Sequence, residues 1–544
     1  MHPQRSPDAE AIPASRPLRF VTAASLFDGH DAAINIMRRL MQDQGAEVIH
    51  LGHNRGVQEI VRAALQEDAD GISVSSYQGG HVEYFKYMVE LLREAGAAHV
   101  RVFGGGGGVI VPAEIRELEG YGVERIYSPE DGRTLGLEGM IADMLERTAR
   151  HRVETLPTRP AGPQEHLAIA RCLTAIENLH GEGQAKARLA AVWPKAGAAR
   201  PPVLGITGPG GAGKSSLTDE LLLRFTRHFP QLRVAMLAVD PTRRRTGGAL
   251  LGDRIRLNAL ADERIFMRSV ATRRSHLATS AVLKDEVDFL ADCGFGLILV
   301  ETAGIGQSDT EIVDLVDLPI YVMTSEYGAA TQLEKIDMLD YAELIVLNKF
   351  EKRGAEDALR DVRKQWRRNR HAFDAPDAAV PVFPTIASQF NDPGVNWLFV
   401  SLCRRLVDKL GLDAARWTPQ LDVTQREPRA QALIPGSRSR YLADIAGEGR
   451  ALRAQLEREA EAASLAQSHY ESLESLDDPA LPAPLTPYPQ SALTDGGDRT
   501  LLTLRQRYNA ALGELSDEST ELLSQWPARR DAVTAEHYSY DVRG

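Results

Sequence analysis

A phosphate-binding loop between a strand and a helix is the feature that most limits the fold of this chain. The segment GPGGAGKSS, residues 208–216, matches the pattern G-x-x-x-x-G-K-[ST]. It follows the apolar stretch PPVLGIT and precedes the amphipathic stretch LTDELLLRF, which is the context that the pattern requires. A glycine-rich turn that holds no nucleotide is the alternative, and the flanking strand and helix argue against it. The sequence therefore predicts a P-loop α/β domain.

The residue types of this loop define what it can hold. Its backbone N–H groups would surround a β-phosphate, Lys214 would reach the β- and γ-phosphate oxygens, and the Ser215 hydroxyl would bind Mg²⁺. We expect Lys214 to act in catalysis as well as in binding. The predicted nucleotide-binding residues of the loop are Gly208, Gly210, Gly211, Ala212, Gly213, Lys214, Ser215 and Ser216.

The segment LILVETAGIGQSD, residues 297–309, is typical of a buried strand that ends in a carboxylate. P-loop proteins place a metal-side carboxylate and a γ-phosphate-sensing glycine at such a point. We expect Glu301 and Thr302 to lie at Mg²⁺. Gln307 is a candidate for orienting the attacking water, and a structural role for this residue is equally open.

A second strand end indicates which base the nucleotide carries. The segment LIVLNKFE ends in Asn348, Lys349 and, two residues later, Glu351. It resembles the guanine-reading element N-K-x-D, whose carboxylate accepts hydrogen bonds from the guanine ring. Glu351 has one methylene more than aspartate, so the strictness for guanine is open. The segment PTIAS, residues 384–388, is the expected last base-contacting loop.

Between these motifs lies AVDPTRRRTGGALLGDRIRL, residues 238–257. One interpretation is a solvated surface loop, and the other is a switch segment that helps to bind Mg²⁺ and phosphate. Together with the other motifs, the segment resembles the G-protein chaperones of cobalamin-dependent acyl-CoA mutases. In that family the acidic residues that match Asp240, Asp253 and Glu301 contribute to the Mg²⁺ site. By the same analogy Arg256 reaches the nucleotide, and the bound nucleotide is GTP.

Short apolar runs alternate with helical stretches from about residue 18 to residue 150. The runs RFVTAASLF, AEVIHLG, GISVSS, VRVFGG and ERIYSP indicate strands. Strands that alternate with helices form a parallel, doubly wound sheet, which binds ligands at the carboxyl ends of its strands. The sequence therefore predicts a flavodoxin-like domain that carries His30, Ser75 and the glycine run 104–108 at one edge.

The turn that follows the first of these strands reads FDGHDAA. Asp31 could cap the next helix and Gly29 could form the turn, but neither role requires a histidine. The turn resembles D-x-H-x-x-G, the signature of proteins that bind cobalamin with its own base displaced. The resemblance implies that His30 is the lower axial ligand of cobalt and that Asp28 accepts the other ring N–H.

Two further elements of that cobalamin-binding family have counterparts here. The element S-x-L corresponds to Ser75 and Tyr77, and the glycine pair corresponds to Gly105 and Gly106. Small residues there let the displaced nucleotide tail lie against the backbone. The sequence departs from the family at Ala33, where the motif has glycine, and at Tyr77, where it has leucine. We expect altered packing rather than lost binding.

The order of these domains resembles the fused isobutyryl-CoA mutase family. That family uses adenosylcobalamin to interconvert isobutyryl-CoA and n-butyryl-CoA, and it joins a GTPase chaperone to a substrate-binding barrel. No (β/α)₈ pattern follows in this sequence, although such a barrel needs about 250 residues. The resemblance thus implies an acyl-CoA substrate bound on a barrel outside this chain. We expect either a homodimer of a truncated fusion or a complex with a mutase large subunit.

The predicted organisation has five parts. They are a disordered tail (1–17), a cobalamin-binding domain (18–150), a helical connector (151–198), a P-loop GTPase domain (199–415) and a helical, proline-rich linker (416–544), in which 451–467 and 500–526 are the expected helices. The net charge of −12 without a basic stripe argues against nucleic acid, and no apolar run is long enough to span a bilayer. Three widely spaced cysteines and a polar start without a signal peptide favour the cytoplasm.

Three alternative interpretations of the sequence remain. The first is a stand-alone cobalamin-carrying GTPase that serves a separate mutase as a metallochaperone. The second is a signalling protein with a receiver domain, which would need a phosphorylatable aspartate where the sequence reads SVSSYQGG. The third is a mutase for methylmalonyl-, pivalyl- or isovaleryl-CoA, which this sequence does not distinguish because the barrel selects the substrate.

Overall fold

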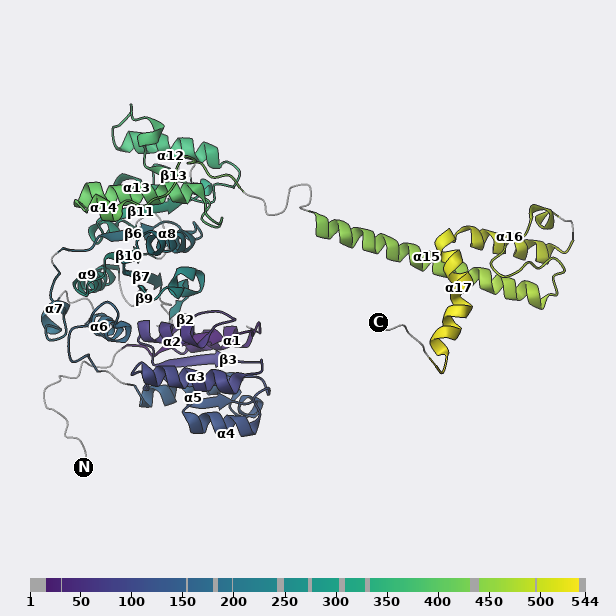
Figure 1. Cartoon of the computed structure of the whole chain (residues 1–544), viewed down its shortest axis with the longest axis horizontal. Coiled ribbons are helices and arrows are strands. Elements are labelled where there is room, and N and C mark those ends of the chain that lie inside the picture. The colour runs from purple at the N-terminus through teal and green to yellow at the C-terminus, as the bar shows by residue number, and fades with distance from the viewer. Residues whose placement is uncertain are drawn as a thin grey trace, which may run out of the picture. The chain divides into compact units, whose positions relative to one another are not determined.

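The chain forms two units, one that contains both parallel sheets and one that is helical (Figure 1). The first unit comprises residues 1–431 and the second residues 432–544. The computed structural model describes residues 16–30, 32–152, 155–179, 184–197, 199–241, 249–272, 276–302, 309–327, 333–430, 440–494 and 497–537. Asp31, Gln307 and the segment 242–248 therefore lie outside the described residues.

The first sheet has the strand order β5-β4-β3-β1-β2-β8, and all its pairings are parallel. The first five strands and the helices between them, here called the first domain, confirm the predicted doubly wound fold. Its elements are β1 (Arg19–Ala24), α1 (Ala32–Asp43), β2 (Glu47–His50), α2 (Val57–Gln66), β3 (Gly71–Ser75), α3 (His81–Glu94), β4 (Arg101–Gly105), α4 (Pro112–Tyr121), β5 (Arg125–Tyr127) and α5 (Pro129–Arg150).

Alternate residues of the first sheet enter two different cores. Phe20 of β1 packs with Met41 of α1 and Ile141 of α5, whereas Val21 packs with residues of α2, α3 and α4, such as Phe85. This alternation is what a sheet covered on both faces requires. Helices α1 and α5 thus cover one face of the sheet, and α2, α3 and α4 cover the other.

The second sheet has the order β13-β12-β11-β6-β10-β7-β9 and is also parallel throughout. Helix α8 and helix α13 cover one face, and α6, α9, α11 and α12 cover the other. The elements from β6 to α14, here called the second domain, follow α6 (His166–Asn178) and α7 (Ala185–Arg188). They are β6 (Val203–Thr207), α8 (Lys214–His228), β7 (Val234–Pro241), β8 (Ala249–Leu251), η1 (Asp253–Arg256), η2 (Asn258–Ala261), β9 (Ile265–Thr272), α9 (His276–Asp292), β10 (Leu297–Glu301), η3 (Asp309–Asp314), β11 (Leu318–Met323), η4 (Ser325–Tyr327), α11 (Met338–Tyr341), β12 (Leu344–Leu347), α12 (Ala355–Asn369), η5 (Asp377–Ala379), β13 (Val382–Pro384), α13 (Pro393–Leu410) and α14 (Ala414–Trp417).

Strand β8 comes from the second domain but completes the sheet of the first. It pairs with β2, with Ala249 opposite Glu47 and Leu251 opposite Ile49. Ala249 and Leu251 are fully buried in the core formed with α2 and α3. For the described part of 238–257, a solvated surface loop is therefore wrong, because Ala249 and Leu251 fill the core of the neighbouring domain.

A buried cluster of charges joins the two domains. The guanidinium of Arg19 in β1 donates to Glu47 (2.8 Å), Glu67 (3.4 Å) and Glu177 (3.3 Å), and all four side chains are almost completely buried. On the second domain, the Nε of Arg268 donates to Glu177 (2.9 Å). Burial alone would lower the pKa of Arg19, but the three carboxylates raise it above its ordinary value. The arginine therefore stays charged within a neutralising shell of carboxylates.

The second unit is helical, as predicted, but its helices differ from the expected ones. The first helix is longer than 451–467, and 500–526 is not one helix, because Ser516 begins a new helix as an N-cap that accepts a hydrogen bond from the Ser519 N–H. Its elements are α15 (Tyr441–Ser475), η7 (Gln490–Leu493), α16 (Arg499–Gly513) and α17 (Asp517–Thr534). Among the described helices of the whole chain, none is both long and apolar enough to cross a membrane.

Replacing Arg19 by alanine should strongly destabilise the first unit. The change leaves buried glutamates without their shared cation, and removing one partner of a buried ion pair costs about 3–5 kcal/mol. We expect the urea midpoint of unfolding, followed by circular dichroism, to fall accordingly. Arg133, whose side chain is 77% exposed in its pair with Glu130, is the matched control. Its replacement by alanine should change stability by less than about 0.5 kcal/mol. Equal shifts for the two variants would contradict the structural role of the cluster.

Candidate functional site

A buried aspartate organises the turn that follows β1. The carboxylate of Asp28 has no exposed surface. Its Oδ1 accepts hydrogen bonds from the His30 backbone N–H and from the His30 ring at Nδ1, both at 2.9 Å. Its Oδ2 accepts the backbone N–H of Tyr77 at 2.6 Å. One carboxylate therefore fixes the histidine ring and ties the turn after β1 to the segment after β3.

The environment of Asp28 also sets the chemical form of His30. Burial pushes the pKa of Asp28 upward, but the hydrogen bonds from Tyr77 and His30 outweigh it, so this pKa lies below its ordinary value. An ionised carboxylate only accepts hydrogen bonds, so the Nδ1 of His30 carries the proton. The side chain of His30 is 68% exposed. In the neutral imidazole the lone pair is then on Nε2, which can act as a ligand for a metal.

The other predicted residues of this site lie around the turn. Ser75 ends β3 and is the direct partner of Gly105, the last residue of β4. The Tyr77 ring lies 5.5 Å from the His30 ring, measured between centroids. A Cβ atom on Gly106 would lie 2.1 Å from the carbonyl oxygen of Ser76, so only glycine fits there. The structure thus brings Asp28, His30, Ser75, Tyr77, Gly105 and Gly106 together at one edge of the sheet.

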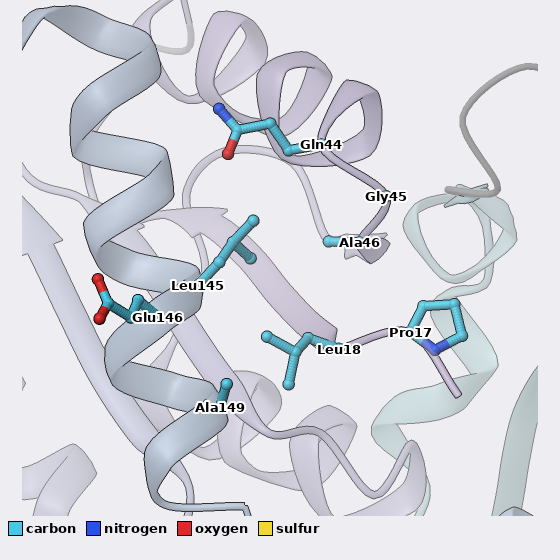
Figure 2. A pocket seen from close by; sticks show the side chains of 8 residues that line it. All are labelled: Pro17, Leu18, Gln44, Gly45, Ala46, Leu145, Glu146 and Ala149. Atoms are coloured by element: carbon cyan, nitrogen blue, oxygen red, sulfur yellow. The ribbon is translucent and has the colours of Figure 1, made fainter. Parts of the chain in front are cut away.

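A hollow of about 410 Å³ lies elsewhere on the first domain, between α1 and α5 (Figure 2). It opens beside Leu18, which precedes β1, whereas His30 follows the carboxyl end of that strand. The hollow is therefore at the opposite edge of the sheet from the histidine turn and does not form part of that site. Its lining residues are Pro17, Leu18, Gln44, Gly45, Ala46, Leu145, Glu146 and Ala149.

The P-loop of the second domain has the geometry that its sequence predicts. Gly213 has a φ of +93°, and a Cβ atom there would lie 2.3 Å from Nδ2 of Asn348. Helix α8 begins at the next residue, so its N-terminal N–H groups face the loop. The Lys214 ammonium curls back over the loop and donates to the carbonyl oxygens of Gly208 (2.9 Å) and Pro209 (3.3 Å).

The carboxylate of Glu301 lies directly beneath this loop. It accepts the Ser215 hydroxyl at 2.8 Å and the Thr218 hydroxyl at 2.7 Å. The Thr302 hydroxyl donates to Thr207 at 2.8 Å. Thr218 was not predicted from the sequence, although it lies three residues after Ser215 and therefore on the same face of α8. The predicted pair of Ser215 and Glu301 is brought into contact.

Two further carboxylates approach Glu301. The pKa of Asp240 is raised by burial and by the negative charges of Asp253 and Glu301. Burial also raises the pKa of Asp253, whose side chain contacts Asp240. Burial and the charge of Asp253 raise the pKa of Glu301 to about 6. Within the described residues, no three acidic, histidine or cysteine side chains converge closely enough to enclose a metal ion. The site is thus a loose group of carboxylates that repel one another.

Arg256 lies at the rim of this group, with its side chain 63% exposed and its NH1 3.8 Å from Oδ1 of Asp253. It lies near the carboxylates, and among the described residues no hydrogen bond joins it to the P-loop. Its contact with a nucleotide therefore stays a prediction. Gln307 lies outside the described residues. Its proposed role with water is therefore also untested.

Asn348 connects the P-loop to the expected base-reading segment. Its Nδ2 donates to the Ala212 carbonyl oxygen at 2.9 Å, and its Oδ1 accepts the Ala387 N–H at 3.0 Å and the Thr385 hydroxyl at 3.1 Å. Lys349 and Glu351 follow in the turn, and Glu351 is exposed. The segment 384–388 therefore lies beside N-K-x-E, as the sequence predicts.

Asp392 supports this base-reading segment and was missed in the sequence. Its buried carboxylate caps α13 by accepting the Val395 N–H (2.8 Å) and also accepts the Ile386 N–H (3.2 Å). The signal was available, because an aspartate before Pro393 is a typical helix start. Burial raises the pKa of Asp392 to about 6, although these hydrogen bonds and the charge of Arg224 act to lower it.

Comparison with known proteins identifies the class to which these two sites belong. Residues 18–130 match the family model of the B12 binding domain, and residues 169–427 match that of the methylmalonyl Co-A mutase-associated GTPase MeaB. The chain therefore consists of a B12-binding domain and a MeaB-family GTPase domain, followed by a helical region.

Several curated proteins are similar to all or part of this chain. The fused isobutyryl-CoA mutase of Geobacillus kaustophilus is 48% identical over 97% of this chain and 47% of the relative. That of Cupriavidus metallidurans is 49% identical over 98% of this chain and 47% of the relative. The GTPase ArgK of Escherichia coli is 36% identical over 34% of this chain and 56% of the relative. The chain is thus a homologue of the fused isobutyryl-CoA mutases and spans about half of their length.

Replacing Asp392 by asparagine should alter how stability depends on pH. In the unfolded chain an aspartate ionises near pH 3.9, and in the folded protein Asp392 ionises near pH 6. Its contribution to stability is therefore fully present below about pH 4 and is lost as the pH rises through 6. Between pH 4 and pH 7 we expect the wild type to lose up to about 3 kcal/mol more unfolding free energy than Asp392→Asn. Urea titrations at both pH values measure this difference, and parallel pH profiles would refute it.

Proposed function

We propose that the first domain binds adenosylcobalamin with its own base displaced and that His30 is the lower ligand of cobalt. One observation carries this proposal: Asp28 accepts the proton of Nδ1, which leaves Nε2 of an exposed imidazole as a ligand. A carboxylate behind a metal-binding histidine raises its basicity and fixes its orientation. Imidazole nitrogen is a suitable donor for a transition metal such as cobalt.

The residues beside the turn fit the displaced nucleotide tail of the cofactor. The hydroxyl of Ser75 is buried and has no hydrogen-bond partner among the described residues. A buried hydroxyl without a partner is costly, so a polar group of a ligand would satisfy it. Gly105 and Gly106 present bare backbone at the same edge, as a tail lying against the sheet requires.

The second domain, in this proposal, binds and hydrolyses GTP with Mg²⁺. The ion would be held by Ser215, Asp240, Asp253, Glu301 and Thr302. The pKa values of the three acidic members are raised chiefly by burial, and a divalent cation would favour their ionised forms. Lys214 would turn from the Gly208 carbonyl to the β- and γ-phosphates. Asn348, Lys349 and Glu351 would contact the base, and Arg256 the phosphates.

The two sites together support a role in an acyl-CoA mutase. We assign the chain the cofactor-binding and chaperone parts of an isobutyryl-CoA/n-butyryl-CoA mutase, in which GTP gates loading and protection of the cofactor. When bound, the cobalamin supplies the radical chemistry of the rearrangement. The acyl-CoA would bind to a barrel outside these 544 residues, in a partner mutase subunit or a further segment.

Replacing His30 by alanine should remove the ligand to cobalt. We expect titration of the wild type with adenosylcobalamin to give the ultraviolet–visible spectrum of histidine-ligated cobalt and His30→Ala to lack it. Asp28→Asn should keep the spectrum but weaken affinity by about 10–100-fold, because a neutral amide supports the imidazole less well.

Two controls make this titration specific. His151→Ala removes an exposed histidine after α5 and should leave the spectrum unchanged. Lys214→Ala should abolish GTP hydrolysis while cobalamin still binds, because the two sites are on different domains. If His30→Ala gives the wild-type spectrum, then His30 is not the ligand and the proposal for the first domain fails.

A further inference from the structure

One short turn of the second domain lies between the two proposed sites. Turn η1, Asp253–Arg256, follows β8, which is a strand of the first domain's sheet. The turn is short, yet successive residues point to different partners. Asp253 contacts Asp240 at the proposed Mg²⁺ site, and the N–H of Gly252 donates to Oδ2 of Asp240 at 3.3 Å. One end of the turn thus belongs to the nucleotide site.

The next residue anchors the turn to the first domain. Arg254 donates through Nε to Oε1 of Glu67 at 2.7 Å and through NH2 to Oε1 of Gln66 at 2.9 Å. Glu67 follows the last residue of α2 and is fully buried. Because Arg254 is hydrogen-bonded to two residues at the end of α2, a movement of the turn would disturb the first domain.

The third residue reaches the strand ends that carry the histidine turn. A Cβ atom on Gly52 would lie 2.6 Å from Cδ1 of Ile255, so Ile255 occupies the space that a side chain at position 52 would need. Gly52 has a φ of +87°, and its carbonyl oxygen accepts the N–H of Ala24 at 2.9 Å. Ala24 is the last residue of β1, four residues before Asp28. Two contacts therefore connect the turn of Asp253 to the turn of His30.

Ile255 is not explained by core packing alone. Its side chain is 40% exposed, whereas Leu251 just before the turn is fully buried. The interface is already held by β8 and by the buried charges, so a partly exposed isoleucine adds little to stability. Because Ile255 lies against Gly52, a glycine with positive φ, a shift of either residue would change this contact.

We propose that the contact between Ile255 and Gly52 couples nucleotide binding to cobalamin binding, with both residues acting as positioning residues. The proposal rests on the proposed function and adds the element that carries the coupling. A ligand that pulls Asp253 toward Mg²⁺ shifts Ile255 against Gly52, and with it the backbone that leads from Ala24 to Asp28. By linkage, cobalamin binding must shift nucleotide affinity by the same factor.

The test is a binding cycle on the full chain. The dissociation constant of a non-hydrolysable GTP analogue with Mg²⁺ is measured with and without saturating adenosylcobalamin, and that of adenosylcobalamin with and without the analogue. In the wild type we expect both ratios to agree and to differ from one by about fivefold or more. Ile255→Ala should bring both ratios close to one, while each ligand alone binds within about twofold of wild type. Ile255→Val, which lacks only Cδ1, should fall between them.

The control is Leu223→Ala, a truncation of an equally exposed aliphatic residue on α8 of the second domain. It should retain the wild-type ratios. If Ile255→Ala retains them as well, the coupling proposal is overturned and the proposed function stands. If the wild type binds both ligands with ratios of one, the coupling proposal is overturned together with gating by GTP, while the assignment of a cobalamin site and a GTP site stands. If the wild type fails to bind either ligand, the proposed function itself is wrong, and the coupling proposal falls with it.

Discussion

The buried carboxylate of Glu67 is the point on which the joining of the two domains depends. It accepts Arg254 from η1, the backbone N–H and hydroxyl of Ser269 in β9, and Arg19 from β1. Ser269 is 202 positions from Glu67 in the chain. Because a fully buried charge is unfavourable without its partners, separating the domains would leave several unpaired charges. The electrostatics thus favour one arrangement of the domains.

This arrangement places the two candidate sites under a common constraint. The sheet of the first domain is complete only with β8, and β8 runs directly into the turn that carries Asp253. On the other side of β2, strand β1 ends at the turn that carries Asp28 and His30. A sheet transmits small displacements along its hydrogen-bonded strands, since its core is close-packed. The nucleotide site is therefore built partly on the domain that holds the histidine.

Features that depend only on residues close together in the chain could be predicted from the sequence. The P-loop between β6 and α8, the D-x-H turn after β1 and the N-K-x-E turn after β12 are short segments whose geometry follows from local rules for glycine, strand ends and helix starts. Both doubly wound sheets followed from the alternation of apolar and helical stretches.

The features that were missed depend on long-range pairing. Strand β8 has only three residues, and nothing in ALL reveals that it pairs with β2 some two hundred positions earlier. The charges of Arg19 and Glu67 are unremarkable in the sequence and become informative only when both are buried. The role of Thr218 required knowing that Glu301 lies beneath α8. Each of these follows from tertiary contacts rather than from local propensity.

The most direct test of the account is hydrogen–deuterium exchange at β8 in the full chain without ligands. If Ala249–Leu251 is a strand of the first sheet, then the amide of Ala249, which donates to the Ala46 carbonyl at 3.3 Å, should exchange much more slowly than that of an unstructured peptide. Exchange of this amide at the rate of an unstructured peptide, with β2 still protected, would show that the domains are not joined in this way and would contradict the account.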